Sequence, residues 1–138
     1  MKRKGSSIIF INDEDEILLL LRDDNPDIPY PGVWDVPGGH VEKNETPEQC
    51  IIREMEEEME IHLENFNLFS VIEFSDRVEY TFWKRKNFDI DSIILHEGQC
   101  IKWFKREKIV NLELAYGFDG ILNSFFQKKV ISKTSGSA

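Results

Sequence analysis

Residues 37–61 constrain the fold of this chain more than any other segment, because a Pro-Gly-Gly step leads into a strongly signalled helix. Thr46 is a favourable N-cap residue, Pro47 suits the first helical position, and Gln49 completes a capping-box pattern. Five glutamates then crowd into residues 54–60. The sequence therefore predicts a turn at the glycine pair, followed at once by an acidic helix.

The glutamates of this helix are concentrated on one side of it. At about 100° per residue, Glu54, Glu57 and Glu58 share one arc roughly 100° wide, beside an apolar stripe that contains Met55 and Met59. Like charges three or four residues apart destabilise a helix by roughly a few tenths of a kcal/mol per pair. Two interpretations follow: a solvated glutamate-rich face, or carboxylates collected for a hard divalent cation, above all Mg²⁺.

The order of residues around the helix favours the second interpretation. The segment resembles the signature box of the Nudix hydrolases, in the order Gly39, five residues, Glu45, seven residues, and then REMEEE from Arg53 to Glu58. Glu60 stands where that box has a glycine. Either Glu60 adopts a left-handed backbone conformation, at a cost of about 1 kcal/mol, or the helix runs slightly longer.

The remaining pattern predicts strands and one more helix. The expected strands are 7–11, 17–21, 34–36, 67–74, 78–85 and 100–104, and the expected second helix is 118–129. Strands interleaved with helices indicate an α/β protein, and the resemblance implies the Nudix-type α/β/α sandwich with a mixed β-sheet. We expect a single domain over residues 1–138, with about 131–138 as a disordered tail.

The resemblance also implies a chemistry, the attack of water on a phosphorus atom of a nucleoside diphosphate linked to another group. The cofactor would be Mg²⁺, for which Mn²⁺ can substitute. By this resemblance Glu54, Glu57 and Glu58 are metal ligands, one of them serving as the base instead, and the Gly38 carbonyl completes the metal shell. Arg53 and Glu45 would hold the carboxylates in place through charge-assisted hydrogen bonds.

Other segments resemble the MutT branch of the family, whose members hydrolyse nucleoside triphosphates such as 8-oxo-dGTP to monophosphates. These segments are NETPEQ at 44–49 and the predicted hairpin at 68–83. Glu97 stands where MutT-type enzymes carry a further metal-binding glutamate; the alternative is an ordinary loop acid. Arg22 stands where they carry a phosphate-contacting arginine; the alternative is a surface salt bridge.

The resemblance is weaker where the base would bind. MutT-type enzymes read the oxidised purine with an asparagine just before the last helix, and residues 115–119 contain none. Tyr116, Phe118 or Phe82 could stack on a base, and Asp119 could accept hydrogen bonds from one; otherwise the aromatic rings belong to the core. Triphosphate hydrolysis is therefore predicted without a preference for 8-oxo-dGTP.

Composition narrows the function classes. A formal net charge of −9 argues against a protein that grips nucleic-acid backbones. No apolar run approaches the roughly 20 residues of a membrane helix, and two cysteines without a secretion signal favour free thiols in a cytoplasm. We expect a cytoplasmic monomer or homodimer whose partner is a nucleotide, with no membrane and no nucleic acid.

Two alternatives stay open at the level of sequence. The first is a hydrolase of ADP-ribose, nucleotide sugars or other nucleoside diphosphate derivatives, which would differ only in what the pocket holds beyond the phosphates. The second is a non-catalytic module that senses a nucleotide. Such a module is expected to have lost box glutamates, whereas Glu45, Glu54, Glu57 and Glu58 are all present.

Overall fold

The computed structural model describes residues 2–130, so the tail expected at 131–138 lies outside the described residues. Within the described part, no helix has the length and apolar character needed to cross a membrane. The chain forms, in order, β1 (Arg3–Ile11), β2 (Ile17–Leu21), β3 (Trp34–Asp35), β4 (Gly38–His40), α1 (Pro47–Met59), β5 (Asn67–Glu73), β6 (Arg77–Arg85), the 3₁₀ turn η1 (Ile90–Ser92), β7 (Cys100–Phe104), α2 (Arg106–Ile109), the 3₁₀ turn η2 (Ala115–Gly117), α3 (Phe118–Phe125) and a π-helical turn (Phe126–Val130).

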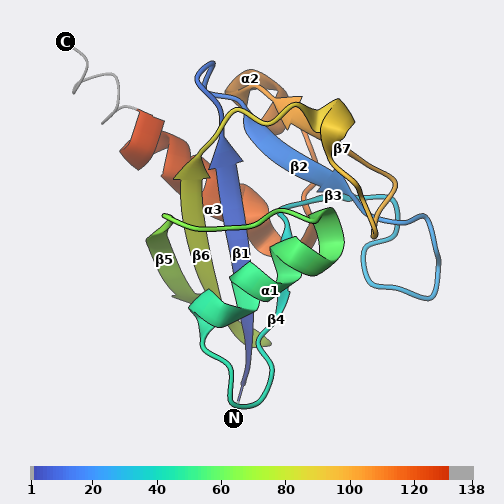
Figure 1. Ribbon diagram of the computed structural model, residues 1–138, viewed down its shortest axis with the longest axis vertical. Coiled ribbons are helices and arrows are strands. Elements are labelled where there is room, and N and C mark those ends of the chain that lie inside the picture. Colours follow the sequence, from blue (N-terminus) through green and yellow to red (C-terminus); the bar gives the residue numbers. More distant parts are fainter. Residues whose placement is uncertain (1, 131–138) are drawn as a thin grey trace.

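A seven-stranded mixed sheet organises the described residues (Figure 1). The main order is β3-β2-β1-β6-β5, with β4 alongside β1 and β7 alongside β2. β1 runs parallel to β6 over their whole length, while its pairings with β2 and β4 are antiparallel. The predicted mixed sheet is thereby confirmed, and β1 stands at its centre.

Alternate side chains of β1 enter two different cores. Ile8 and Phe10 pack with Ile51, Met55 and Met59 of α1 on one face. Ile9 and Ile11 pack on the other face with the last helix, through residues that include Phe118, Ile121, Leu122 and Phe125. Figure 1 shows α1 in front of the sheet and α3 behind it. The predicted α/β/α layering is confirmed.

The first half of the acidic segment contains one wrong prediction. The glycine pair does not make a turn: Gly38 and Gly39 belong to β4, which pairs with β1 at Ser6 and Ser7. A Cβ atom on Gly38 would lie 2.2 Å from the Ser6 carbonyl oxygen, closer than any real contact. Glycine is needed here because two backbones approach closely, and not because the chain reverses.

The helix itself follows the prediction closely. The Thr46 hydroxyl accepts from the Gln49 backbone N–H, and the Gln49 side chain accepts from the Thr46 N–H, which completes the capping box. At the other end Glu60 has φ 52° and ψ 36°. The helix therefore stops at Met59, and Glu60 takes up the left-handed conformation that the glycine of the box would adopt.

The other predicted elements differ from the structure mainly at their ends. β2 and β7 have the predicted bounds, and the hairpin of β5 and β6 is present. β1 begins at Arg3 instead of Ser7, because its polar first half pairs with β4 and β6. The short elements η1, α2 and η2 carry too little periodic pattern to be predicted.

Candidate active site

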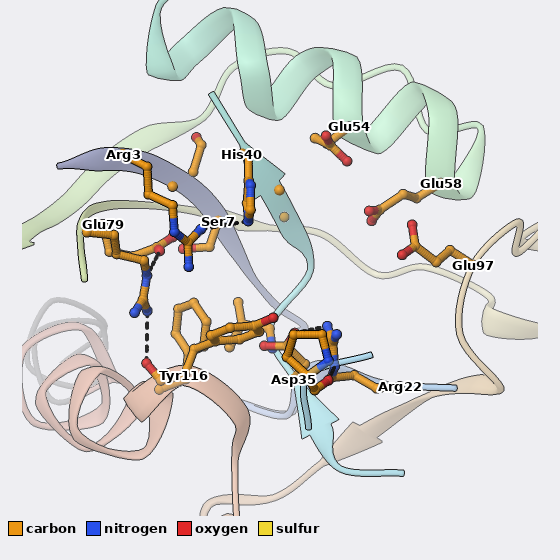
Figure 2. Close-up of a pocket in the computed structure, with 18 of the residues that line it drawn as sticks. Arg3, Ser7, Arg22, Asp35, His40, Glu54, Glu58, Glu79, Glu97 and Tyr116 are labelled. Atoms are coloured by element: carbon orange, nitrogen blue, oxygen red, sulfur yellow. Dashed lines mark hydrogen bonds and ion pairs between the residues drawn. The ribbon is translucent and has the colours of Figure 1, made fainter. Parts of the chain in front are cut away.

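A cavity of about 490 Å³ opens along the edge where β1, β4 and β6 meet the loops that precede β7 and α3. Its lining residues come from almost every part of the chain: Arg3, Gly5, Ser6, Ser7, Arg22, Pro29, Asp35, Val36, Gly38, Gly39, His40, Glu42, Arg53, Glu54, Glu58, Arg77, Glu79, Glu97, Tyr116 and Phe118. Figure 2 shows the carboxylates of Glu54, Glu58 and Glu97 gathered at one end. Glu79, Ser7 and Tyr116 lie toward the other end.

Two elements form the carboxylate end. The i,i+4 spacing of Glu54 and Glu58 places both on the side of α1 that faces the cavity. Glu97 comes from the long loop between β6 and β7, and its side chain points toward Glu58 (Figure 2). The backbone N–H of His96 donates to the Glu58 carbonyl at 2.8 Å, which fastens this loop to the helix.

The clustered carboxylates at this end of the cavity favour the binding of a cation. Burial, together with the adjacent carboxylates of Glu54 and Glu97, raises the pKa of Glu58 well above its usual range. In the described residues no group of three or more His, Cys, Asp or Glu side chains already has the geometry of a metal site. The donor chemistry nevertheless fits the divalent cation that the family resemblance implies, since Glu54, Glu58 and Glu97 offer oxygen ligands whose mutual repulsion a cation would relieve.

Arg53 links the glutamates of the box. Its Nε and Nη2 donate to the two carboxylate oxygens of Glu45, at 2.7 and 3.1 Å, and its Nη1 donates to Glu54 at 2.9 Å and Glu57 at 3.2 Å. The bond from Arg53 lowers the pKa of Glu45 to about 2. This bidentate pair fixes the guanidinium, which in turn orients Glu54 toward the cavity.

Gly39 provides the room that Glu54 occupies. A Cβ atom at Gly39 would come within 2.4 Å of both the carboxyl carbon and Oε1 of Glu54. Gly38, the predicted carbonyl ligand, also lines the cavity. The glycine pair therefore allows β4 to pass closely beneath the carboxylates of α1.

Arg22 and Asp35 form a third side of the cavity. Arg22 Nη1 donates to Asp35 Oδ2 at 3.2 Å, its Nε donates to the Pro29 carbonyl, and its guanidinium lies 5.3 Å from the ring centre of Tyr116. Burial raises the pKa of Asp35 to about 6, although Arg22 acts in the opposite direction. Arg22 therefore lines the cavity but is already paired with a carboxyl group.

The structure brings most of the predicted site residues to the cavity and leaves four outside its lining, one of which is Glu45, held beside it by Arg53. Phe82 is buried in the core on the α1 face, edge-on to Phe66, and does not line the cavity. Asp119 is exposed on α3, and Glu57 is directed to Arg53 with 60% of its side chain exposed; neither lines the cavity. Tyr116 and Phe118, in contrast, do line it.

Several lining residues were missed in the sequence, most notably Arg77 and Glu79. Arg77, Glu79 and Thr81 alternate along β6 and are all buried. Polar residues at every second position of a strand signal two distinct faces, of which the polar one usually faces solvent. That signal was present in RVEYT at 77–81, but which face of β6 turns inward depends on its pairing with β1.

Known proteins that this chain resembles include an 8-oxo-dGTP diphosphatase and a MutT protein. The 8-oxo-dGTP diphosphatase of Escherichia coli (strain K12) is 37% identical over 78 residues, which are 54% of this chain; the chain spans 59% of the length of that relative. A solved MutT structure from a study of the Aliivibrio salmonicida and Vibrio cholerae proteins is 26% identical, with a TM-score of 0.76, over 93% of this chain and 99% of that one.

A more distant structure shares the fold alone. The NUDIX domain of Shewanella oneidensis NrtR, solved in complex with ADP ribose, is 15% identical over 94% of this chain and 89% of that one, with a TM-score of 0.74.

The family model described as "NUDIX domain" matches residues 1–123, which include every lining residue of the cavity. The chain belongs to the NUDIX domain family.

Proposed function

We propose that this protein is a Mg²⁺-dependent pyrophosphohydrolase that cleaves nucleoside triphosphates to a monophosphate and pyrophosphate. One observation carries the proposal: Glu54, Glu58 and Glu97 converge at one end of a cavity whose other end has aromatic and polar walls. The first end suits cation-bound phosphates, and the second suits a nucleoside. The similarity to an 8-oxo-dGTP diphosphatase supports the same reaction.

In this proposal the carboxylates of Glu54, Glu58 and Glu97 hold the cation, with the Gly38 carbonyl as a further ligand. When bound, Mg²⁺ (or Mn²⁺) polarises the phosphoryl oxygens and lowers the pKa of a water molecule. Glu57 is assigned a role as metal ligand or base only through the resemblance of its position, since its carboxylate here binds Arg53. Arg53 and Glu45 are positioning residues, because they fix Glu54 through the bonds described above.

The base would lie at the opposite end of the cavity. The ring centre of Tyr116 lies 5.3 Å from the guanidinium of Arg22 and 5.4 Å from that of Arg77. Phe118 is buried beside it. We assign stacking to Tyr116 and Phe118, and a phosphate contact to Arg22 once a substrate competes with Asp35. Phe82 and Asp119 have no part in this assignment because neither lines the cavity.

We also propose a cytoplasmic location and a monomer or homodimer. Cys50 is a buried free thiol and Cys100 an exposed one. Burial raises the pKa of the Cys50 thiol to about 12, so Cys50 stays protonated and serves packing. An exposed free thiol on Cys100 suits a reducing compartment.

The test is a panel of nucleoside triphosphates, their 8-oxo forms, ADP-ribose and nucleotide sugars, incubated with Mg²⁺ and analysed for every product. The proposal predicts that triphosphates are turned over and that pyrophosphate and monophosphate appear in equal amounts. Turnover confined to ADP-ribose or a nucleotide sugar would contradict it. Tight nucleotide binding without turnover of any compound would favour the sensing module instead.

A further inference from the structure

We propose that Glu79, held by Arg77, reads the base of the nucleotide and selects bases that present adjacent N–H donors, as the 2-amino-6-oxopurine edge of guanine does. This inference rests on the proposed function, because it assigns the base to the end of the cavity opposite the carboxylate cluster. It concerns residues of this chain that neither the signature box nor its supporting residues include.

Arg77 donates a hydrogen bond to the protein from each of its three guanidinium nitrogen atoms. Its Nε donates to Glu79 Oε1 at 2.6 Å, its Nη1 to Asp76 at 3.3 Å and its Nη2 to the Tyr116 carbonyl at 2.8 Å. The guanidinium also lies 4.4 Å from the ring centre of Phe74. Because every nitrogen of Arg77 already donates, its role is to hold Glu79 and not to bind a phosphate.

Glu79 is buried but incompletely satisfied. Its relative exposure is 4%, it lines the cavity, and among residues 2–130 Arg77 is the one group that donates to its carboxylate, at Oε1. Oε2 has no such donor and is not among the fully buried unpaired side-chain atoms of the described residues, so it is open to the cavity. Oε2 is therefore an acceptor that a ligand in the cavity can satisfy.

Gly5 makes this position possible. Gly5 on β1 is the register partner of Glu79 on β6, and a Cβ atom at Gly5 would lie 2.4 Å from Glu79 Oε1. Without that Cβ, the carboxylate lies over β1. Ser7, the next residue on the same face, contributes a hydroxyl to the cavity and shares a hydrogen bond with Thr81.

The two acidic ends of the cavity differ in how their charge is balanced. Among the described residues, Glu54, Glu58 and Glu97 face one another with no matching cation beyond Arg53. Glu79 has an arginine at 2.6 Å. The first end needs an external cation, whereas the second needs only neutral N–H donors, so phosphates and base are expected at different ends.

The chemistry of the bases then decides which of them fits. Guanine offers an imino N–H next to an amino group, so its edge can donate twice to one carboxylate. Adenine and cytosine place a ring acceptor beside the amino group, which a carboxylate repels. Since a site built to accept a hydrogen bond rejects analogues without the donor, Glu79 should favour guanine-type bases, and the 8-oxo form keeps the same edge.

The experiment measures binding of the product monophosphates by calorimetry, which requires no turnover. Wild type should bind dGMP about 10- to 100-fold more tightly than dIMP, which lacks the amino group, since a hydrogen bond to a charged group has that worth. Glu79→Gln should weaken dGMP binding by a similar factor and bring dGMP and dIMP close together. Glu73→Gln is the matched control on the exposed strand β5, and should leave both affinities unchanged.

A second variant covers the case in which Glu79→Gln fails to fold. Gly5→Ala keeps the charge but displaces the carboxylate, so dGMP affinity should fall while dIMP affinity changes less. Circular dichroism and thermal melting verify the fold of each variant. Equal binding of dGMP and dIMP by wild type, or dGMP binding that is unchanged in a folded Glu79→Gln protein, would overturn the inference and leave Arg77–Glu79 as a structural ion pair.

The proposed function can fail separately. If no triphosphate is hydrolysed but dGMP binding still depends on Glu79, base reading stands and triphosphate hydrolysis falls. If triphosphates are hydrolysed while the Glu79→Gln protein retains the dGMP affinity of wild type, the reverse holds.

Discussion

At the scale of a single residue, folding removes the Asp35 carboxyl group from water and thereby changes its affinity for a proton. Only 6% of the residue is exposed, and burial raises the pKa of its carboxyl group from 3.8 to about 6 despite the bond from Arg22. The folded protein therefore holds the Asp35 proton more tightly than the unfolded chain does. The contribution of Asp35 to stability is complete below about pH 4 and is lost as the pH rises through 6.

The raised pKa of Asp35 gives a prediction about the dependence of stability on pH. Between pH 4 and pH 7 wild type should lose up to about 3 kcal/mol of unfolding free energy that an Asp35→Asn variant does not lose, at about 1.36 kcal/mol for each pH unit between the two pKa values. Urea unfolding of both proteins at the two pH values measures this difference. Because all other titrating groups are shared, parallel stability curves would show that Asp35 ionises as readily in the fold as in water.

At the scale of elements, the end of α1 and the loop before β7 depend on each other. Glu60 ends the helix in a left-handed conformation, and its carboxylate is 2.6 Å from Nε2 of His96, the neighbour of Glu97. A non-glycine residue in that conformation costs about 1 kcal/mol, whereas an exposed ion pair is worth roughly 0–1 kcal/mol. Both side chains are about half exposed, so backbone strain is the larger of the two effects.

Glu60→Gly should therefore stabilise the protein slightly, by a few tenths to about 1 kcal/mol of unfolding free energy, since it relieves the strain and loses only the ion pair. Denaturant unfolding of Glu60→Gly and of His96→Ala, which loses the ion pair alone, separates the two contributions. A Glu60→Gly protein less stable than wild type would mean that the contact with His96 outweighs the backbone strain.

The pairing of β4 with β1 gives a second prediction at this scale. Gly38→Ala should destabilise the protein by roughly 3 kcal/mol or more, because the added methyl group would overlap the backbone of β1. Gly120→Ala is the matched control. Among the described residues, no atom beyond its chain neighbours and the backbone of α3 lies within 4 Å of a Cβ at that position, so the change should be neutral or stabilise by up to about 1 kcal/mol. Thermal melting compares the two, and equal melting temperatures would contradict the close β1–β4 approach.

For the molecule as a whole, the sequence was informative where the signal is local. The capping box at Thr46 and the stripe of Glu54 and Glu58 depend on residues a few positions apart, and both were predicted. Glu97 could be assigned only through resemblance, because nothing near it in the sequence shows that its loop reaches α1. The hydrogen bond from His96 to Glu58 supplies that information.

The remaining errors and omissions come from long-range pairing. Phe82 and Glu79 lie three residues apart on β6 and point to opposite faces, so one enters the core and the other the cavity. The register with β1, which is more than 70 residues away in the chain, fixes that choice, and a shift by one residue would exchange the faces. The pairing of β4 with β1, which is also long-range, hid the role of Gly38 against Ser6.

The most direct test of the whole account titrates Mg²⁺ and follows pyrophosphate release from dGTP by wild type and by Glu58→Gln. We predict one pyrophosphate for each dGMP, no release in the presence of a chelator, and a rate in folded Glu58→Gln that falls by more than the roughly 10- to 100-fold typical of losing an outer-shell partner. Release of orthophosphate, turnover that persists without divalent cations, or a Glu58→Gln rate near that of wild type would contradict the assignment of this cavity.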